Sequence, residues 1–179
     1  MVLRHILTTV RAADVWVGSN YAARIPRLLI LGESTYGSSL PLISYVPGWI
    51  SGAVKDRTFS NLYIALSTCS NSLRSCSKTH IWDCIAFFNF VPGSIGTTYK
   101  SKASPSHFRS ARSSLRQMVS LLAPTGVLIL GLSQSDFSRP VIEQQCVPYV
   151  IVPHCGRAFS KSDAEFLGKS WDVLTRIAS

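Results

Sequence analysis

Four apolar segments of the chain lack the polar alternation of a half-exposed strand. They span residues 28–31, 81–90, 126–130 and 148–152. Such runs are typical of strands that are buried on both faces of a parallel sheet. Near its end, each run meets Gly, Pro, Asn or His. The pattern therefore predicts four parallel strands whose ends carry polar or turn-forming residues.

Between and after these runs, apolar residues recur at steps of three and four, which predicts helices. The helical segments span residues 58–67, 104–122 and 161–178. Strands that alternate with helices indicate a parallel sheet covered by helices on both faces. We therefore expect an α/β fold: a three-layer αβα sandwich with a central, mostly parallel four-stranded sheet. One domain over residues 1–179 accounts for the whole chain.

Capping residues mark where the three helices should begin. Thr58 opens the first helix. Ser104 is the expected N-cap of the second, with Pro105 in its first turn. In the third, Ser162 is the expected N-cap, and Glu165 follows at the spacing of a capping box.

The charge of the chain points to a polyanionic partner. The chain has 18 Lys and Arg against 9 Asp and Glu, a formal net charge of +9. This balance favours nucleic acid, although an acidic membrane surface or solubility alone also fits. Arg109, Arg112 and Arg116 form a basic stripe beside the apolar face of the second helix. Such a stripe is most often a solvated surface.

Composition narrows the class of protein further. No apolar run reaches the ~18 residues of a membrane span. The first residues lack the continuous apolar core of a signal peptide. We therefore expect a cytoplasmic protein without membrane contact. The five cysteines include no CxxC pair, which predicts reduced thiols and neither a disulfide framework nor a metal centre.

The ends of the four predicted strands should share one rim, because ligands of open α/β folds bind beyond the carboxyl ends of the strands. Glycine, hydroxyl, carboxylate, amide and imidazole groups all occur there. The rim residues are Glu33, Ser34, Tyr36, Asn89, Gly131 and His154.

Three kinds of site have features in common with the first strand end, GESTYGSS. A phosphate loop needs a lysine where this chain has Ser38. An SGNH-like esterase would use Ser34 as nucleophile and His154 as base. However, Ile151 stands in place of the acid that orients the base, and Phe87 in place of a glycine. The third kind is a base-binding pocket.

A base-binding pocket needs groups that the rim supplies. An acid or amide near a strand end can position a water molecule. An Asn offers a donor and an acceptor to the edge of a pyrimidine. A His can donate to a carbonyl oxygen that becomes negative as a glycosidic bond breaks. Aromatic side chains can stack on an extruded base.

Four ordered segments, LLILGESTYG, WDCIAFFNFVP, LLAPTGVLILG and VPHCGRAFS, resemble the motifs of the uracil-DNA glycosylase superfamily. They cover about residues 27–160. The chain is most similar to a poorly characterised bacterial branch. That branch has a G-E-S-x-Y-G first motif, an F-x-N-Y-V-like middle motif, and a last motif with His followed by F-S.

The resemblance implies a role for each matching residue. Gly32–Tyr36 would form the water-positioning motif, in which Tyr36 would exclude the methyl group of thymine. Asn89 would contact the base, and His154 would stabilise the oxygen of the leaving base. Phe59 is a candidate for the stacking aromatic residue.

The resemblance also assigns a role to the loop after the last motif, which in the family inserts a wedge into the minor groove. In this chain that loop contains Arg157 and Phe159. The chain departs from the most active uracil-specific members at Ser34, where they carry Asp. Glu33 keeps an acid one position earlier. The last motif has His154-Cys155-Gly156 where His-Pro-Ser is frequent in the family.

The implied function is a DNA glycosylase that removes a deaminated base: uracil, hypoxanthine or xanthine. Glu33, or a water molecule held by Ser34, would interact with the cationic sugar, and His154 would stabilise the departing base. We expect a monomer that binds DNA and uses no metal or organic cofactor. The alternatives are a catalytically silent nucleic-acid-binding module and the SGNH-like esterase that uses Ser34 and His154.

Overall fold

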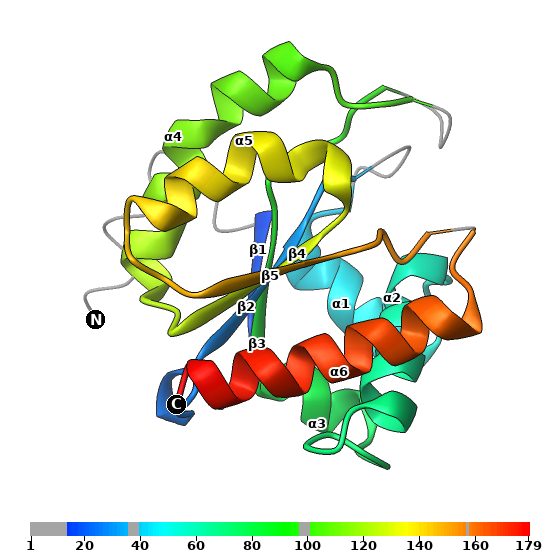
Figure 1. Ribbon diagram of the computed structural model, residues 1–179. Coiled ribbons are helices and arrows are strands. Elements are labelled where there is room, and N and C mark those ends of the chain that lie inside the picture. Colours follow the sequence, from blue (N-terminus) through cyan, green and yellow to red (C-terminus); the bar gives the residue numbers. More distant parts are fainter. Residues whose placement is uncertain (1–13, 36–39, 97–100, 157) are drawn as a thin grey trace.

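The computed structural model describes residues 14–35, 40–96, 101–156 and 158–179. It shows an α/β fold with a five-stranded, mostly parallel sheet flanked by helices (Figure 1). The strand order is β1-β3-β2-β4-β5. The strands are β1 (Val15–Val17), β2 (Leu28–Gly32), β3 (Ile85–Asn89), β4 (Gly126–Leu130) and β5 (Tyr149–Val152).

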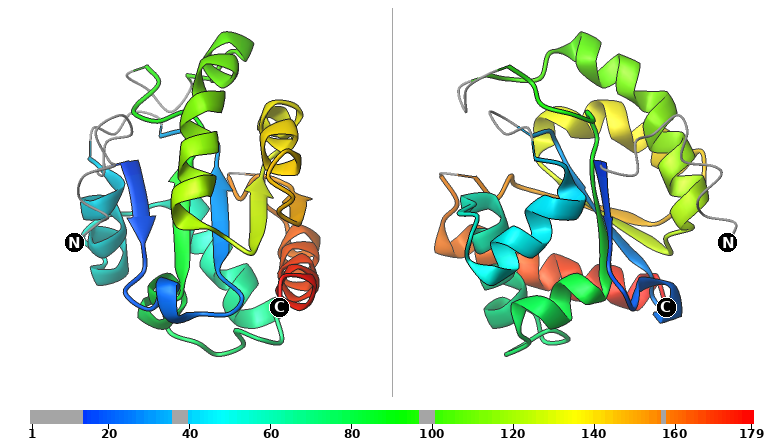
Figure 2. Two further views of the ribbon diagram at one scale, coloured as in Figure 1. Left: turned by 90° about the vertical axis from the view of Figure 1, so that its left-hand side faces the viewer. Right: turned by 180° about the vertical axis from the view of Figure 1, so that it is seen from behind.

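Helices cover both faces of this sheet, as the two views of Figure 2 show. Helices α4 and α5 pack on one face; α1, α2, α3 and α6 pack on the other. Their bounds are α1 (Leu42–Ser51), α2 (Arg57–Ile64), α3 (Lys78–Asp83), α4 (Pro105–Leu122), α5 (Leu132–Glu143) and α6 (Lys161–Ile177). A short 3-10 helix, η2 (Tyr21–Ala23), and a π-helical turn, η3 (Ala65–Cys69), complete the described elements.

Strand β2 lies at the centre of the sheet, and this position explains why its sequence is apolar throughout. It pairs in parallel with β3 on one side and with β4 on the other. Leu28 and Ile30 pack into the core under α1, α2, α3 and α6, whereas Leu29 and Leu31 pack under α4 and α5. Both faces of the strand are therefore buried, as the uninterrupted apolar run predicts.

The four predicted parallel strands are confirmed, but the expected four-stranded sheet is wrong. Strand β1 adds a fifth, antiparallel strand at the edge, where Val15 pairs with Phe88. Its position is supported by Trp16, whose indole N–H donates to the carbonyl oxygen of Trp82 at 2.8 Å. A strand of three residues is too short to produce a recognisable sequence period.

The run over residues 81–90 divides between two elements. Its first residues belong to α3, which begins after the N-cap Ser77, and only Ile85–Asn89 form β3. Ile81 and Trp82 are buried in the same core as the neighbouring strands. A short apolar run cannot distinguish a buried helical turn from a buried strand, and here tertiary packing decided between them.

Two of the predicted helix starts are corrected by the side chains that cap them. Asp56, rather than Thr58, caps α2, because its carboxylate accepts the N–H of Phe59 at 2.7 Å. Ser160 caps α6 and forms a capping box with Asp163, in place of Ser162 and Glu165.

The start of α4 is confirmed at Ser104 and Pro105, and His107 supplies the partner of its capping box. Helices α1 and α5 were not predicted. Each contains an internal proline, Pro47 and Pro140 respectively, which obscures a helical pattern in the sequence. No helix within the described ranges is both long and apolar enough to cross a membrane.

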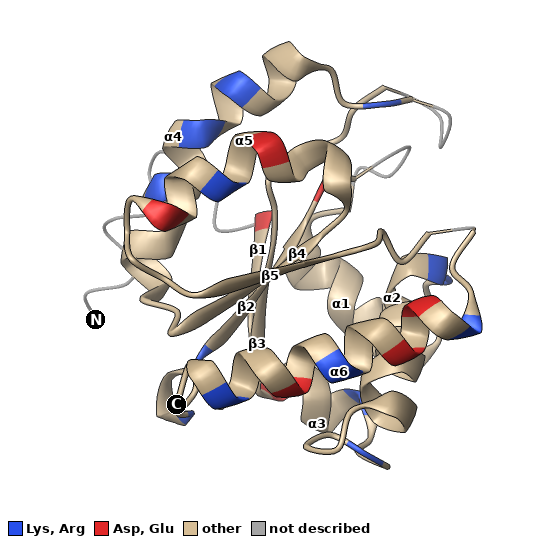
Figure 3. Ribbon diagram, in the orientation of Figure 1, with Lys and Arg blue, Asp and Glu red and all other residues tan. Residues whose placement is uncertain are grey.

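The basic stripe of α4 lies beside α5 (Figure 3). Arg112 donates to the carbonyl oxygen of Phe137 at 3.2 Å, and Arg116 donates to Gln144 Oε1 at 3.2 Å. Two of the three arginines therefore connect α4 to α5 instead of being only solvated.

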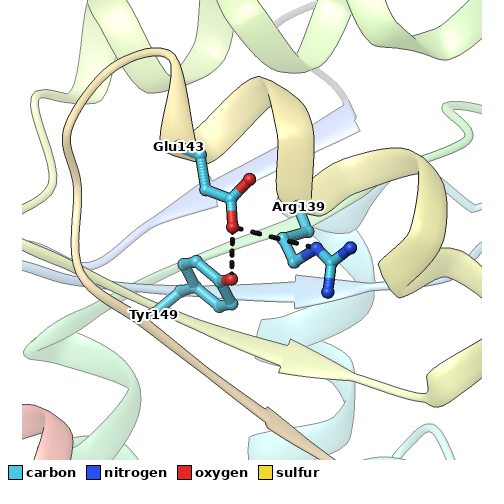
Figure 4. A network of polar contacts seen from close by, with 3 residues as sticks. All are labelled: Arg139, Glu143 and Tyr149. Atoms are coloured by element: carbon cyan, nitrogen blue, oxygen red, sulfur yellow. Dashed lines mark hydrogen bonds and ion pairs between the residues drawn. The ribbon is translucent and has the colours of Figure 1, made fainter.

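A second polar network connects α5 to β5. Tyr149 donates to Glu143 Oε1 at 2.6 Å, and Arg139 Nε lies 3.8 Å from the same oxygen (Figure 4). Because α5 leads directly into β5, these contacts stabilise the return of the chain to the sheet.

Gln134 of α5 joins the ends of two central strands. Its amide Nε2 donates to the carbonyl oxygens of Leu31 in β2 and Leu130 in β4. The side chain is fully buried. Both carbonyls lie at the carboxyl ends of their strands, so Gln134 determines how these two ends sit relative to each other.

Replacing Gln134 with leucine should lower the free energy of unfolding by about 1–3 kcal/mol, because two buried carbonyl oxygens lose their donor. Urea denaturation of the full chain measures this change. Gln117, an exposed residue of α4, provides the matched control, and Gln117→Leu should shift stability by less than about 0.5 kcal/mol. Equal effects of the two substitutions would contradict the assigned role of Gln134.

Candidate functional site

A cavity of about 390 Å³ opens at the carboxyl ends of the central strands. Strand ends, the loops that follow them and the start of α2 all contribute to its wall. The cavity is lined by Gly32, Glu33, Ser34, Thr35, Leu42, Tyr45, Lys55, Asp56, Arg57, Thr58, Phe59, Phe87, Asn89, Leu130, His154 and Gly156. Six of the residues predicted for the site are therefore brought together in one place.

The pairing of β2 with β3 places Gly32 directly beside Asn89. A Cβ atom at position 32 would lie 2.5 Å from Asn89 Oδ1 and 2.7 Å from Phe87 Cζ. Any side chain here would have to displace the amide of Asn89 and the ring of Phe87. The glycine that opens the GES segment thus permits the close approach of two side chains from the adjacent strand.

Asn89 ends β3 with its side chain largely buried, at 8% exposure. Its Nδ2 donates to Thr35 Oγ1 at 2.9 Å. This bond orients the amide and uses one of its two N–H donors. The second N–H and the carbonyl oxygen give the donor–acceptor pair that can contact the edge of a planar ligand.

Glu33 and His154 approach each other across Gly131. A Cβ atom on Gly131 would lie 3.5 Å from His154 Cβ and 4.0 Å from Glu33 Oε2. Gly131 has φ +104, a conformation that favours glycine, and it begins α5 immediately after β4. Because Gly131 has no side chain, the space between the carboxylate of Glu33 and the imidazole of His154 stays open.

The imidazole of His154 is exposed on one side of the cavity and surrounded by protein on others. Desolvation lowers its pKa, while the negative charges of Glu33 and Asp56 act in the opposite direction. Desolvation is the larger effect. His154 is therefore neutral near pH 7 and carries one N–H that can donate to a ligand oxygen.

The loop that carries His154 is held from below by Asn61 of α2. Its Nδ2 donates to the carbonyl oxygens of Cys155 and Gly156, at 3.0 Å each. Cys155 is fully buried, and burial raises the pKa of its thiol to about 12. Cys155 is therefore an inert packing residue, whereas its neighbour faces the cavity.

Aromatic residues form one wall of the cavity. Phe59 is 4% exposed and packs against Trp82 and Phe87, with ring centroids 4.6 and 5.1 Å away. Tyr45 meets Phe59 edge to face at 5.6 Å. Phe59 therefore lines the cavity from within a rigid aromatic cluster. Its stacking on a base remains a prediction.

Asp56 connects the aromatic wall to the start of α2. One carboxylate oxygen accepts the N–H of Phe59, and the other accepts the hydroxyl of Tyr45 at 2.7 Å. Burial and, to a smaller extent, the hydrogen bond to Asp56 raise the pKa of Tyr45. Asp56 is thus a structural acid at the rim, with both oxygens engaged.

The remaining predicted site residues differ in whether they line the cavity. Ser34 lines the cavity, but its hydroxyl donates to the carbonyl oxygen of Thr35 at 3.3 Å. Phe159 is half-buried against the core and does not line the cavity. Tyr36 and Arg157 lie outside the described residues, so the roles predicted for them stay predictions.

Two residues that support the site were not predicted from the sequence: Asp56 and Asn61. Thr35 lies within the predicted motif Gly32–Tyr36, but its contact with Asn89 was not predicted. For Asp56, the sequence offered one signal: an aspartate three residues before Phe59 has the spacing of a helix N-cap. Asn61 contacts a loop 94 residues away, and no local pattern indicates such a contact.

Within the described ranges, no group of three or more His, Cys, Asp or Glu residues is arranged to hold a metal ion. Glu33, Asp56 and His154 all line the cavity, yet they do not form such a group. Glu33, Asn89 and His154 suit hydrogen bonding to an organic ligand, because they place one carboxylate, one amide and one neutral imidazole around a cavity with an aromatic wall.

Comparisons with known proteins assign no family. No protein-family model matches the chain, and no curated protein matches it. The interpretation of the site therefore depends on its residues and their geometry.

Gly32→Ala should lower the free energy of unfolding by about 1–3 kcal/mol, because the new methyl group overlaps Asn89 and Phe87. Asn89→Ala removes one of these overlaps, so the double variant should be more stable than the sum of the single effects predicts, by at least about 0.5 kcal/mol. Urea denaturation of the three variants measures the coupling. Strict additivity would contradict the close approach of Gly32 and Asn89.

Glu33→Gln should lower the pKa of His154 further, because the carboxylate of Glu33 raises it. Titration of the imidazole protons by NMR measures both values, and the wild-type midpoint should already lie below 6.5. Glu143→Gln, which changes an acid near β5, is the control and should leave the midpoint unchanged. If the titration midpoint of His154 instead rises when Glu33 is replaced, the carboxylate of Glu33 does not lie close to the imidazole.

Proposed function

We propose that the chain is a DNA glycosylase-like hydrolase of the uracil-DNA glycosylase type, with its helices and sheet in three layers, that removes a deaminated base. The single observation that carries the proposal is the convergence of Glu33, Asn89 and His154 on one cavity with an aromatic wall. The four ordered motifs support the same conclusion. The protein would act on DNA in the cytoplasm, as a monomer and without a cofactor.

The size and position of the cavity suit an extruded base. Its volume of about 390 Å³ lies near the lower end of the about 300–1,000 Å³ typical of ligand pockets. It opens at the carboxyl ends of parallel strands, where open α/β sheets bind ligands. A base inside a duplex would have to leave the stack to enter it.

The chemistry follows from the roles of three side chains. Hydrolysis breaks the bond between the sugar C1′ and the base nitrogen, and its electron pair moves to the base. The neutral imidazole of His154 donates its N–H to the base oxygen that becomes negative. The amide of Asn89 holds the base edge. The carboxylate of Glu33 stabilises the cationic sugar and accepts a proton from the water that adds to C1′.

Ser34 contributes less than an acid at its position would. Its hydroxyl can hold the attacking water, but it cannot accept a proton from it as a carboxylate can. The proposed enzyme therefore depends on Glu33, and its rate should be modest. Among the described residues, no hydrogen bond joins Ser34 to His154, so no observation favours the esterase alternative.

His154→Ala should reduce base release by about 10²–10³-fold, because the developing negative charge loses a donor. The assay uses oligonucleotides that carry uracil, hypoxanthine or xanthine and measures free base by chromatography. His80→Ala, at an exposed position of α3, is the matched control and should retain full activity.

Two outcomes would overturn this proposal. If wild-type protein releases none of the three bases while still binding DNA, the chain is a catalytically silent nucleic-acid-binding module. If it hydrolyses p-nitrophenyl esters and Ser34→Ala abolishes that activity, the esterase alternative is correct.

A further inference from the structure

A second, shallower groove lies on the other side of the first turn of α2. It has a volume of about 650 Å³ and is more open to solvent than the cavity. Its lining is Trp49, Gly52, Val54, Lys55, Asp56, Arg57, Ser60, Asn61 and Lys78. Lys55, Asp56 and Arg57 border both hollows. The start of α2 is therefore a ridge between the groove and the cavity.

The groove is lined by three cations and one acid. Lys55 and Arg57 are exposed, and Lys78 is half-buried. In the described part of the chain, no ion pair within 4.0 Å involves any of the three. The acid, Asp56, uses its two carboxylate oxygens to accept from Tyr45 and Phe59. The positive charge of the groove is therefore not offset by direct pairing.

Lys78 is held in place by aromatic rings. Its Nζ lies 4.4 Å from the ring centroid of Trp49 and 6.0 Å from that of Tyr63. Trp49 is itself 2% exposed and packs against Phe59 and Trp82. A cation–π contact with a buried ring orients an ammonium group that would otherwise be flexible. This cation is therefore positioned before any ligand binds.

We propose that this groove binds the phosphodiester backbone of the nucleic-acid strand whose base enters the cavity. This inference rests on the proposed function and names the path of the strand. Lys55, Arg57 and Lys78 would contact phosphates next to the extruded nucleotide. A shallow groove with charged walls suits an extended polyanion that stays hydrated, rather than a compact apolar ligand.

The geometry also explains why the strand would pass over this ridge. Lys55 and Arg57 border the cavity and the groove together, so a chain of phosphates that leaves the cavity meets them first. Lys78, from α3, lies on the groove side alone. Three cations, from the segment before α2, from α2 and from α3, thus extend the binding surface away from the cavity.

The test is the binding of a fluorescein-labelled, undamaged oligonucleotide by the full chain, measured by anisotropy at several salt concentrations. The K55Q/R57Q/K78Q variant should bind about ten-fold or more weakly near 0.1 M salt. Its slope of log K against log salt should be smaller by about 2–3 on a duplex and about 2 on a single strand. Single-stranded and duplex probes, compared directly, show which form of the backbone the groove holds.

The matched control removes the same charge elsewhere, with R24Q/R109Q/R176Q. Arg24 lies near the amino ends of β2 and β3, Arg109 is on α4 over the opposite face of the sheet, and Arg176 is in the last turn of α6. If the two variants lose affinity equally, the binding is a net-charge effect and the groove is excluded. Unchanged affinity in the groove variant excludes it as well.

Base release separates this proposal from the proposed function. If the chain is a glycosylase, the groove variant should raise KM by about ten-fold. The single variant K78Q should change kcat by less than about two-fold, because Lys78 borders the groove alone and takes no part in bond cleavage. Loss of binding in the groove variant, together with no base release by wild type, would support the groove and refute the glycosylase. A groove variant with unchanged KM in an active enzyme would refute the groove alone.

Discussion

The parallel pairing of β2 between β3 and β4 is the constraint on which the rest of this structure depends. It brings Gly32 beside Asn89 and the ends of β4 and β5 next to them. Because all four parallel strands end at the same edge, Asn89 at the end of β3 converges there with the polar residues that follow β2 and β5. The missing side chain at Gly32 lets the amide of Asn89 and the ring of Phe87 occupy the space above β2. Any larger residue there would move both.

Side-chain amides and a hydroxyl support this arrangement from behind. Gln134 holds the ends of β2 and β4, Asn61 holds the loop of His154, and Thr35 orients Asn89. Each of these hydrogen bonds joins groups from two separate segments of the chain, and losing such a bond to a buried group is costly. The cavity is thus positioned by hydrogen bonds to regular elements, and such support keeps its functional groups in place.

Electrostatics divides the surroundings of the cavity into two regions. Inside, desolvation keeps His154 neutral in spite of the nearby carboxylates of Glu33 and Asp56. At its edge, Lys55 and Arg57 border both the cavity and the adjoining groove, to which Lys78 adds a third positive charge. A neutral donor next to a carboxylate suits a bond cleavage that places negative charge on one fragment and positive charge on the other. The cations at this edge and in the groove suit a polyanionic ligand.

The sequence by itself determined the α/β class, the four parallel strands, the helix over 104–122 and the meeting of Glu33, Asn89 and His154, because apolar period and strand ends are local signals. The edge strand β1, the division of residues 81–90 between α3 and β3, and the helices with internal prolines were decided by tertiary packing. Tertiary packing also decided which residues support the site. Gln134 donates to the backbone of Leu31 and Asn61 to that of Cys155, and each pair is about 100 residues apart in the sequence. Net charge indicated a polyanion, but only the folded chain shows which three of its 18 basic residues face one groove. Local sequence patterns predict which residues of a segment are buried, whereas the residues that cover them depend on the tertiary structure of the whole chain.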